Sequence, residues 1–271
     1  MARPDLKAFR VEPGSEPRLG ERDPGARVGA DDKKDGLERL ARQVERLAGL
    51  HNRLYAEGTR AVLLVLQGMD TSGKDGTIRR VLTGVNPQGC HVVSFKEPSA
   101  TELAHDYLWR IHAQCPARGE IGIFNRSHYE DVIAVRVREL APERVWRRRY
   151  EQIRGFERML VDEGTAVLKV FLHMSRDEQR ARLQERLDDP EKRWKFRAGD
   201  LDDRKLWGAY QAAYEDALHE TSTEWAPWHV VPSDHNWVRN LAVAELLADT
   251  LERLDPQFPE PDPGVEDTVL E

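Results

Sequence analysis

Cysteine is scarce in this sequence, and long apolar runs are missing. The 271 residues include two cysteines, Cys90 and Cys115, which are too few for a disulfide framework. The longest apolar run, over residues 61–66, is far too short to span a bilayer. The first residues also lack the apolar core of a signal peptide. We therefore expect a cytoplasmic protein with reduced thiols and no membrane partner.

The sequence also lacks an excess of positive charge. Its net charge is −7 at pH 7, which at first argues against a polyanionic substrate. The charge is unevenly distributed, however: nine acidic residues and one arginine follow position 239 and carry −8, so residues 1–239 carry +1. Between Arg144 and Lys205 the chain holds 17 lysines and arginines. Most of these suit solvated helix faces, yet a locally positive field can still attract an anion.

Three segments of the chain differ in composition. Residues 1–34 are rich in proline, glycine and charge without a sustained period, which indicates an extended or disordered arm. Residues 35–255 contain the periodic segments and are expected to form one domain. Residues 256–271 form an acidic, proline-rich tail. The domain begins with a predicted helix over residues 35–57, where apolar residues recur every three or four positions.

Strands and helices alternate along the rest of the domain. We expect strands over residues 61–67, 90–95, 121–124, 167–173 and 229–231. Helical patterns cover residues 73–84, 101–114, 142–163, 177–187, 202–221 and 237–254. This alternation is typical of right-handed βαβ units. It predicts an α/β fold with three layers, α/β/α, around a mostly parallel sheet of about five strands.

The most specific local pattern is G-x-x-x-x-G-K, the Walker A motif, which begins at Gly68 and ends at Lys74. It follows a buried strand and precedes a helix, as a phosphate-binding loop requires. Its glycines let backbone N–H groups turn onto phosphate oxygens, the helix N-terminus adds partial positive charge, and Lys74 adds a full charge. The predicted phosphate- and nucleotide-binding residues of this segment are Gly68, Met69, Thr71, Ser72, Gly73, Asp75, Gly76 and Thr77.

Two carboxylates distinguish this loop from the usual pattern. Asp75 stands where a serine or threonine normally holds Mg²⁺, and Asp70 lies inside the loop. A carboxylate that faces phosphates is repelled unless a cation lies between them, which makes Asp70 the first candidate for a magnesium ligand. The alternative is that both aspartates cap the loop and the helix start, and this role suits Asp75 better.

A second polar cluster follows the third expected strand. Ligands bind at the carboxyl ends of strands in open α/β sheets, so Asn125 and Arg126 should lie beside the phosphate loop. Arg126 can contact phosphate oxygens, or it can form a structural salt bridge with Glu130 or Asp131. Asn125 occupies the place of a metal-binding aspartate in many P-loop enzymes, so it could orient a water or a nucleotide phosphate. We interpret His128 as a packing residue rather than a catalytic one.

A basic segment over residues 177–205 has the composition of a lid. Pro190 ends its first helix, and Arg182 and Arg186 share one face of that helix because they are four positions apart. P-loop kinases use such lids to exclude water and clamp phosphates. We expect Arg182 and Lys195 to bind phosphate. An amphipathic surface hairpin would show the same charge pattern.

Four segments together resemble the polyphosphate kinase 2 family. They are Gly-Met-Asp-Thr-Ser-Gly-Lys-Asp-Gly-Thr at 68–77, Phe-Asn-Arg-Ser-His-Tyr-Glu-Asp at 124–131, Asp-Pro-Glu-Lys-Arg-Trp-Lys-Phe at 189–196 and Thr-Ser-Thr-Glu-Trp-Ala-Pro-Trp at 221–228. They occur in the family's order, and their combination is much more specific than the loop alone. The resemblance implies a P-loop kinase-like fold related to thymidylate kinase. It also implies Mg²⁺ dependence, with Mn²⁺ as an alternative ion, and inorganic polyphosphate as the phosphoryl donor.

The family's functional residues carry over position by position. Asp70 and Lys74 match essential loop residues, and Arg126 matches the arginine of the second motif. Arg186 matches a lid arginine, and Asp200 matches a conserved acid of the lid region. The resemblance therefore assigns these five positions to the chemistry.

Asn125 is the one departure, because many family members have an essential aspartate there. In this respect the sequence resembles a subgroup that accepts both AMP and ADP, which implies that the chain carries AMP through to ATP. The predicted catalytic residues are Asp70, Lys74, Asn125, Arg126 and Arg186, and the predicted metal ligands are Asp70, Glu130 and Asp200.

The predicted activity is reversible phosphoryl transfer from polyphosphate to adenine nucleotides, with guanine nucleotides as further acceptors. Two alternatives remain open: an ATP-dependent nucleoside monophosphate kinase, and a regulator that binds nucleotides or polyanions without catalysis. We expect no nucleic acid partner. The long first helix and the arm favour a homo-oligomer, either a dimer or a tetramer.

Overall fold

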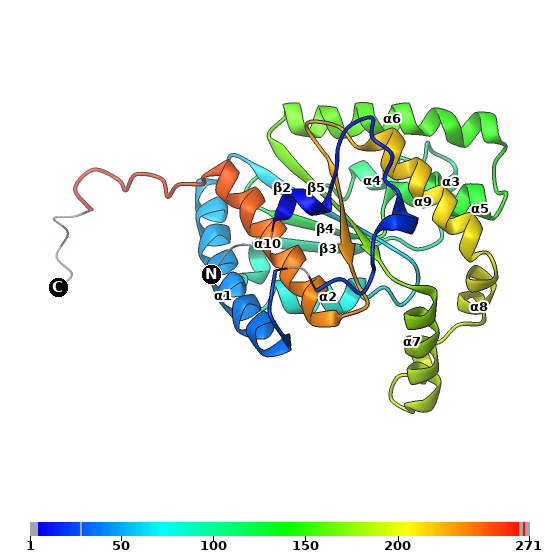
Figure 1. Ribbon diagram of the computed structural model, residues 1–271. Coiled ribbons are helices and arrows are strands. Elements are labelled where there is room, and N and C mark those ends of the chain that lie inside the picture. The colour runs from blue at the N-terminus through cyan, green and yellow to red at the C-terminus, as the bar shows by residue number, and fades with distance from the viewer. Residues whose placement is uncertain (1–4, 28, 266–267, 269–271) are drawn as a thin grey trace.

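A mostly parallel sheet forms the centre of the molecule, and helices cover both of its faces (Figure 1). The computed structural model describes residues 5–27, 29–265 and 268. In these ranges the sheet has six strands in the order β1-β6-β5-β2-β4-β3. They are β1 (Arg10–Val11), β2 (Ala61–Gln67), β3 (Cys90–Ser94), β4 (Ile121–Asn125), β5 (Thr165–His173) and β6 (Trp228–Pro232). All paired neighbours are parallel except β1 and β6, which confirms the predicted α/β class.

The central strand β2 explains the apolar run in the sequence. Every residue of β2 is buried, because β4 and β5 pair with its two edges and helices cover its two faces. A strand in this position has no solvent-facing side. In the register of the sheet, Leu66 lies opposite Asn125 and Gln67 lies opposite Phe171. The carboxyl ends of β2, β4 and β5 therefore meet at one edge, where the loops after them converge.

Two helical layers enclose the sheet, as the three-layer prediction requires. On one face α6 and α9 pack against side chains such as Val65 and Phe171. On the other face α1, α2 and α10 pack against side chains such as Leu64 and Leu168. The α-helices are α1 (Lys33–Glu57), α2 (Lys74–Val81), α3 (Ala100–Leu103), α4 (Trp109–His112), α5 (Ala134–Val137), α6 (Glu143–Asp162), α7 (Arg176–Asp188), α8 (Ala198–Lys205), α9 (Trp207–Thr221) and α10 (Asn236–Leu254). Short 3-10 helices are η1 (Leu6–Phe9), η2 (Leu19–Glu21), η3 (Pro87–Gly89), η4 (His128–Asp131) and η5 (Arg193–Lys195).

The sixth strand, β1, comes from the N-terminal arm and is absent from the sequence prediction. It pairs with Trp228 and His229 of β6. Phe9, Val11 and Leu19 of the arm are buried against the body. These apolar anchors are isolated between prolines, glycines and charges, so no period in the sequence marks them.

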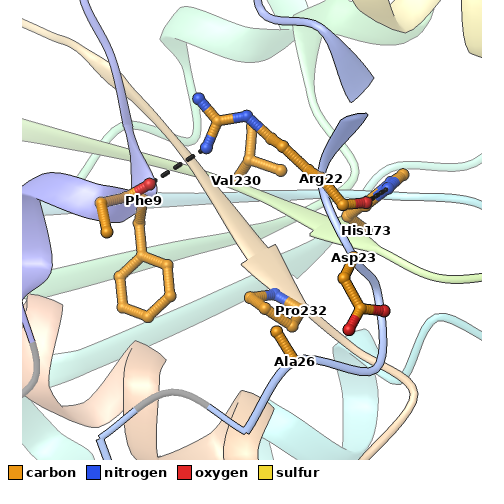
Figure 2. Close-up of a pocket in the computed structure, with 8 residues that line it drawn as sticks. Phe9, Arg22, Asp23, Ala26, His173, Val230 and Pro232 are labelled. Carbon is orange, nitrogen blue, oxygen red and sulfur yellow. Dashed lines mark hydrogen bonds between the residues drawn. The ribbon is translucent and has the colours of Figure 1, made fainter. Parts of the chain in front are cut away.

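The arm predicted over residues 1–34 as extended or disordered follows an extended path along the edge of the sheet, interrupted by η1 and η2. Residues 1–4 and 28 lie outside the described ranges. A small pocket separates the arm from the end of β6 (Figure 2). Its lining residues are Ala8, Phe9, Arg22, Asp23, Ala26, His173, Val230 and Pro232.

The helix predicted over residues 101–114 is interrupted. It forms the two short helices α3 and α4, because Asp106 accepts a hydrogen bond from the N–H of Leu108 at 3.0 Å in a local turn. Its N-cap is Ser99, which forms a capping box with Glu102.

The segment predicted as a lid, which we continue to call the lid, consists of α7, η5 and α8, and α7 extends away from the body of the molecule (Figure 1). Its first helix ends at Asp188, shortly before Pro190, in agreement with the sequence pattern. The helix predicted over residues 202–221 is interrupted at Leu206. Its first part is the end of α8 in the lid, and its second part is α9 in the body.

In the described ranges, the structure contains no helix that is long and apolar enough to cross a membrane. Cys90 and Cys115 are both free thiols. Beyond α10, the described part of the acidic tail runs away from the body (Figure 1). Residues 266–267 and 269–271 of the predicted tail lie outside the described ranges.

Candidate active site

The segment between β2 and α2 is a loop that needs glycine at two positions. Gly68 and Gly73 have φ values of 151° and 100°, and Thr71 between them has a φ of 67°. A Cβ on Gly73 would lie 1.9 Å from a guanidinium nitrogen of Arg239. A Cβ on Gly68 would lie 2.7 Å from the hydroxyl of Ser72. Both glycines of the motif are therefore required for the turn and for the space beside it.

Lys74 begins α2 and bends back over the loop. Its ammonium donates to the carbonyls of Gly68 and Met69 at 2.7 and 3.2 Å. Burial and the nearby Arg126 lower the pKa of Lys74 to about 8, although neighbouring carboxylates such as Asp70 act in the opposite direction. Lys74 therefore remains mostly protonated at neutral pH.

Side chains from other segments bind the remaining carbonyls of the loop. The donors are Gln179 Nε2 to Asp70 at 3.2 Å, Arg182 Nη1 to Thr71 at 3.0 Å, and Ser233 Oγ and Arg239 Nη1 to Ser72 at 2.6 and 3.2 Å. Through these hydrogen bonds, the carbonyl oxygens of the loop are bound to side chains of other segments. These contacts leave the N–H groups at the start of α2 as the donors for an anion, while the N–H of Ser72 donates to the carbonyl of Met69.

Arg126 and Asp70 form an ion pair at the centre of the site. Arg126 directly follows β4 with a φ of 63°, and its N–H donates to the carbonyl of Leu66 on β2 at 3.1 Å. Its Nη2 donates to the carboxylate of Asp70. Burial raises the pKa of Asp70, but Arg126, Lys74 and Arg186 outweigh this effect and hold that pKa below its ordinary value.

The alternative that assigned Arg126 to a salt bridge with Glu130 or Asp131 is wrong about the partner. Asp131 pairs instead with Arg149 at 3.3 Å. Glu130 acts on Arg126 at longer range: burial lowers the pKa of Arg126, but Glu130 and Asp70 together raise it above its ordinary value. The guanidinium therefore lies among carboxylates and stays charged.

The lid adds a second ion pair to this cluster. Arg186 of α7 lies 3.5 Å from the carboxylate of Asp200 at the start of α8. Burial and the neighbouring Asp70 raise the pKa of Asp200. The structure thus brings Asp70, Lys74, Arg126 and Arg186 into one electrostatic cluster, although they come from three separate parts of the chain.

Asn125 and Asp75 contact each other beside the loop. The amide of Asn125, the last residue of β4, donates to the carboxylate of Asp75 in the first turn of α2. This contact ties β4 to the loop helix. Next to it, Gln67 in its hydrogen-bonded amide orientation donates to Glu130 at 3.1 Å. Asp75 therefore has a structural contact, but with the side chain of Asn125 and not with the backbone, as the capping alternative would require.

Three predicted binding residues lie outside the cluster. The hydroxyl of Thr77 is buried against α10, where it accepts a hydrogen bond from Arg239 at 2.7 Å. Arg182 donates to backbone carbonyls behind the loop, so it supports the loop instead of facing its anion site. Lys195 is exposed on the lid, with its ammonium 5.2 Å from the ring centre of Trp194. The positions of Thr77 and Arg182 argue against direct phosphate contacts through their side chains.

Among the described residues, no three acidic, histidine or cysteine side chains are arranged as a metal-binding group. Two of the three predicted ligands form ion pairs: Asp70 contacts Arg126, and Asp200 contacts Arg186. The third, Glu130, raises the pKa of Arg126 in the same cluster. Carboxylate oxygens still suit Mg²⁺, which commonly binds through one or two carboxylates together with substrate phosphates and waters. The donor set therefore fits this mode of magnesium binding.

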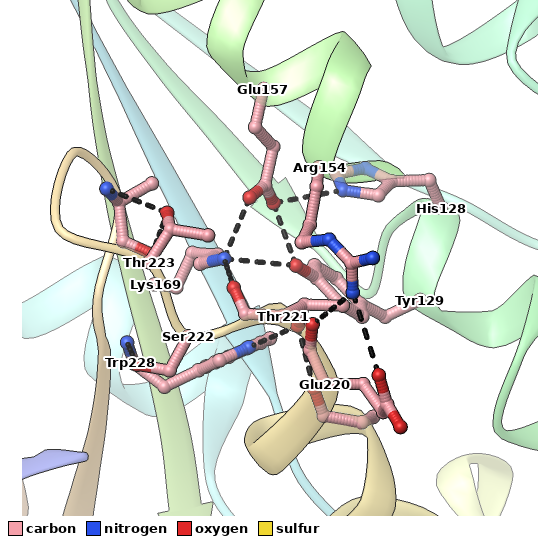
Figure 3. A network of polar contacts seen from close by, with 12 residues as sticks. His128, Tyr129, Arg154, Glu157, Lys169, Glu220, Thr221, Ser222, Thr223 and Trp228 are labelled. Atoms are coloured by element: carbon pink, nitrogen blue, oxygen red, sulfur yellow. Dashed lines mark hydrogen bonds and ion pairs between the residues drawn. The ribbon is translucent and has the colours of Figure 1, made fainter. Parts of the chain in front are cut away.

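A fully buried polar network holds η4, the short helix that follows Arg126 in the chain (Figure 3). The ammonium of Lys169 on β5 donates to Glu157 of α6 at 2.6 Å, to the hydroxyl of Tyr129 at 3.0 Å and to the carbonyl of Thr221 at 2.7 Å. Tyr129 in turn donates to Glu157 at 2.7 Å. Since Tyr129 is three residues after Arg126, this network fixes the turn after β4.

His128 belongs to the same network and is a packing residue, as the sequence analysis expects. It is fully buried, with Nε2 3.3 Å from Glu157, and burial lowers its pKa (Figure 3). The fourth motif of the sequence, residues 221–228, also meets this network. The indole of Trp228 donates to the hydroxyl of Thr221 at 2.9 Å.

Several residues of the site are absent from the sequence prediction. Lys169 had a detectable signal, because a lysine in the middle of an apolar strand implies a buried partner. Gln179, Ser233 and Arg239 had none, since each reaches the loop from a distant segment whose local pattern is an ordinary helix or turn.

Comparison with known proteins gives consistent matches. The family model of polyphosphate kinase 2 matches residues 30–259. The AMP/ADP-polyphosphate phosphotransferase of Meiothermus ruber is 57% identical over 267 residues, which cover 98% of this chain and 100% of that relative. The ADP-polyphosphate phosphotransferase of Rhodopseudomonas palustris is 46% identical, with 98% and 96% covered. The crystal structure of polyphosphate kinase 2 from Arthrobacter aurescens has a TM-score of 0.93 at 44% identity, with 96% and 93% covered.

Proposed function

The chain belongs to the polyphosphate kinase 2 family, and from this premise we propose that it transfers phosphoryl groups from inorganic polyphosphate to both AMP and ADP. The general activity, polyphosphate-dependent phosphorylation of a nucleotide, is that of the family. The use of both acceptors is supported by the name of the Meiothermus ruber relative and by its 57% identity over nearly the whole chain.

One observation carries the proposal. Lys74, Arg126 and Arg186 converge with the phosphate loop on the single carboxylate of Asp70. A donor phosphate, its neighbours in the chain and an acceptor phosphate together bring several negative charges into one place. Their mutual repulsion is the main barrier to phosphoryl transfer, and positive groups held in position lower it.

The reaction is an in-line displacement. An anionic phosphate oxygen of AMP or ADP forms a bond to the terminal phosphorus of polyphosphate, and the bond from that phosphorus to the bridging oxygen breaks. The leaving group is polyphosphate shortened by one unit, which leaves as an anion. Because the attacking oxygen is already deprotonated at neutral pH, the site needs no strong general base. One phosphoanhydride replaces another, so the reaction is reversible.

The arginines can contact phosphate without losing their carboxylates. Arg126 uses Nη2 for Asp70, while 41% of its side chain remains exposed. A guanidinium has five N–H donors in a fixed fork, so the others remain available for phosphate oxygens. Arg186 approaches from the lid, where closure would bring it onto the transferring group and exclude water.

We infer that Asp70 and Glu130 hold Mg²⁺ together with substrate phosphates, with Asp200 nearby and Mn²⁺ as an alternative ion. The bound metal would supply positive charge between the carboxylates and the phosphate oxygens. Dialysis against a chelator tests this assignment: activity should disappear and return with added Mg²⁺, and Asp70→Asn should weaken metal binding.

A donor–acceptor matrix tests the proposed function. Polyphosphate or ATP is supplied as donor against AMP, ADP, GMP and GDP, and products are separated by ion-exchange chromatography. We expect polyphosphate to convert AMP to ADP and ADP to ATP. Phosphorylation of AMP by ATP alone would favour an ATP-dependent nucleoside monophosphate kinase. Polyphosphate binding without any turnover would favour a non-catalytic regulator.

We further propose a cytoplasmic homo-oligomer. Two free cysteines are consistent with a reducing compartment. On α1, Leu37 and Tyr55 are 46% and 44% exposed, so this helix offers apolar side chains to a second copy. Light scattering coupled to size-exclusion chromatography distinguishes a dimer or tetramer from a monomer, and Leu37→Glu should shift the equilibrium toward monomer.

A further inference from the structure

Arg239 of α10 lies directly behind the phosphate loop. Arg239 is 3% exposed, and its guanidinium contacts the loop through a backbone carbonyl. Nη1 donates to the carbonyl of Ser72 at 3.2 Å, and Nε donates to the hydroxyl of Thr77 at 2.7 Å. The further acceptors are the amide oxygens of Asn236 at 2.7 Å and of Asn240 at 3.1 and 3.2 Å.

The glycines of the motif admit this guanidinium. A Cβ added to Gly73 would lie 1.9 Å from Nη1 of Arg239. A Cβ added to Gly76 would lie 3.4 Å from Nη2 of the same side chain. Gly73 therefore has two functions: it allows the left-handed turn before α2, and it lets a cation approach the loop backbone. Arg239 therefore contacts the loop directly, and does not act on it only through the packing of α10.

The charge of Arg239 has no acidic partner in the described part of the chain. All its acceptors are neutral, and the charged group that acts on it is another cation, Arg182. Burial and Arg182 lower the pKa of Arg239 to about 9, which shows that its environment disfavours the charge. A buried charge without a counter-ion is strongly unfavourable for folding, so such groups are usually paired.

Two other buried cations of the molecule follow that rule. Arg39 is 9% exposed and donates to Glu245 of α10 at 3.0 Å. Lys169 is fully buried and pairs with Glu157 at 2.6 Å. Arg239 differs from both because its charge faces the back of an anion-binding loop.

We propose that Arg239 is a positioning residue of the phosphate loop, and that the phosphates of the bound donor are the counter-ions of its buried charge. It holds the Ser72 carbonyl away from the anion site and adds a full positive charge beneath the loop N–H groups. The proposal rests on the proposed function, because it assumes that a polyphosphate occupies the loop. It predicts that the charge of Arg239, and not only its hydrogen bonds, determines the affinity for the donor.

The test measures binding of inorganic tripolyphosphate without an acceptor nucleotide, by calorimetry in magnesium-containing buffer at several salt concentrations. Arg239→Gln retains an amide donor but removes the charge, and we expect its Kd to rise on the order of tenfold with a weaker salt dependence. Arg239→Lys retains the charge, so it should lie much closer to the wild type. Arg39→Gln is the matched control: it should lower the melting temperature and leave the Kd unchanged.

A second variant leaves the guanidinium in place. Asn236→Asp puts a carboxylate 2.7 Å from Nη1 at an exposed position near the start of α10, so it neutralises the charge without removing any contact. We expect this variant to melt higher than the wild type and to bind tripolyphosphate more weakly. In the Arg239→Gln background, Asn236→Asp should change the Kd much less. This result would show that the new carboxylate acts by pairing with Arg239, and not by repelling the anion from a distance.

The outcomes distinguish the two proposals. If the wild type binds tripolyphosphate and Arg239→Gln and Asn236→Asp bind it equally well, Arg239 has only a structural role and the inference is overturned. If Arg239→Gln does not fold, Asn236→Asp alone decides, because unchanged affinity in that variant overturns the inference too. If the wild type neither binds tripolyphosphate nor uses polyphosphate, the proposed function fails first and this inference fails with it.

Discussion

The phosphate loop and the lid both present positive charge to the same cluster, but they are built in opposite ways. Lys74 in the loop is 8% exposed, and the loop carbonyls are bound by side chains from several other segments. In the lid, Arg186 pairs at 3.5 Å with Asp200, which also belongs to the lid, and Trp194 is 76% exposed. The loop is therefore prearranged for an anion. The lid is tied to the body near its two ends, by Gln179 and Arg182 of α7 and by the ion pair of Asp203 with Arg138, so its outer part has the fewest contacts to lose when it moves.

This contrast allows one site to combine charges that are fixed in advance with access for its substrates. Electrostatic stabilisation requires charges that are already oriented before the reaction. Entry of a long polyanion and release of the nucleotide require a part that opens. Substitutions made separately in the fixed half and in the movable half test this difference.

The largest effect is expected in the fixed half, at Lys74. Lys74→Met removes the loop's full charge and should lower kcat/KM by about 10³-fold, since such groups stabilise the charge that develops in transfer. The melting temperature should change little, because burial already disfavours the charge of Lys74. Steady-state kinetics and thermal denaturation measure the two quantities. Turnover within a few-fold of the wild type would remove Lys74 from the mechanism.

The second-largest effect is expected on stability. It concerns the buried polar network behind Arg126, which makes the fixed half of the site rigid. Lys169→Met leaves the carboxylate of Glu157 buried without its cation, and we expect a loss of about 3–5 kcal/mol in the free energy of unfolding. Urea denaturation measures it. The double variant Lys169→Met/Glu157→Gln should recover much of the loss. Equal stability of the single variant and the wild type would show that the pair contributes nothing.

The third effect is expected in the movable half. Arg186→Gln should lower kcat by about 10²-fold while the free energy of unfolding changes by less than about 1 kcal/mol, because its one ion pair is loosely formed. The matched control is Lys192→Gln, which removes one positive charge from the same lid at a pair with Glu185 and Asp189. If both variants lose the same activity, the lid acts through its overall charge and not through Arg186.

The smallest expected effect is the pH dependence that Lys74 gives to kcat/KM. The pKa of Lys74 is lowered from 10.5 to about 8, so kcat/KM should fall as pH rises above about 8 and the ammonium loses its proton. The contribution of Lys74 to stability has the opposite sign. Between pH 8 and 10.5 the unfolded chain binds more protons at this residue than the folded chain does, so its contribution increases with pH. A pH profile of kcat/KM that stays flat to pH 9.5 would contradict the assignment.

The sequence alone permits a close prediction of the sheet. The strand over residues 61–67 agrees with β2 at both ends, because a strand buried on both faces must be apolar throughout. The phosphate loop is equally visible, since its glycines and its lysine act through local geometry. Interrupted helices are harder to predict: a single hydrogen bond from Leu108 to Asp106 ends a helix whose apolar pattern continues.

Parts of the candidate site could not be predicted in this way. Arg182 has the helix spacing of a phosphate-binding arginine, yet it lies behind the loop and donates to the carbonyl of Thr71. Its spacing shows which face of α7 it shares with Arg186, but not what that face meets. The strand β1 is similar, because two residues of an irregular arm become a strand only when β6 offers them an open edge.

The sequence by itself determined the order of strands and helices, the phosphate loop and the identity of the groups that carry charge. These features depend on residues that are close together in the chain, and their chemistry is local. Only the tertiary structure decided which cations face the anion site and which support it from behind. Thr71 and Arg182 are 111 positions apart, and Ser72 and Arg239 are 167 apart. No local pattern relates such residues, because the packing of α7 and α10 on the sheet is what brings them together.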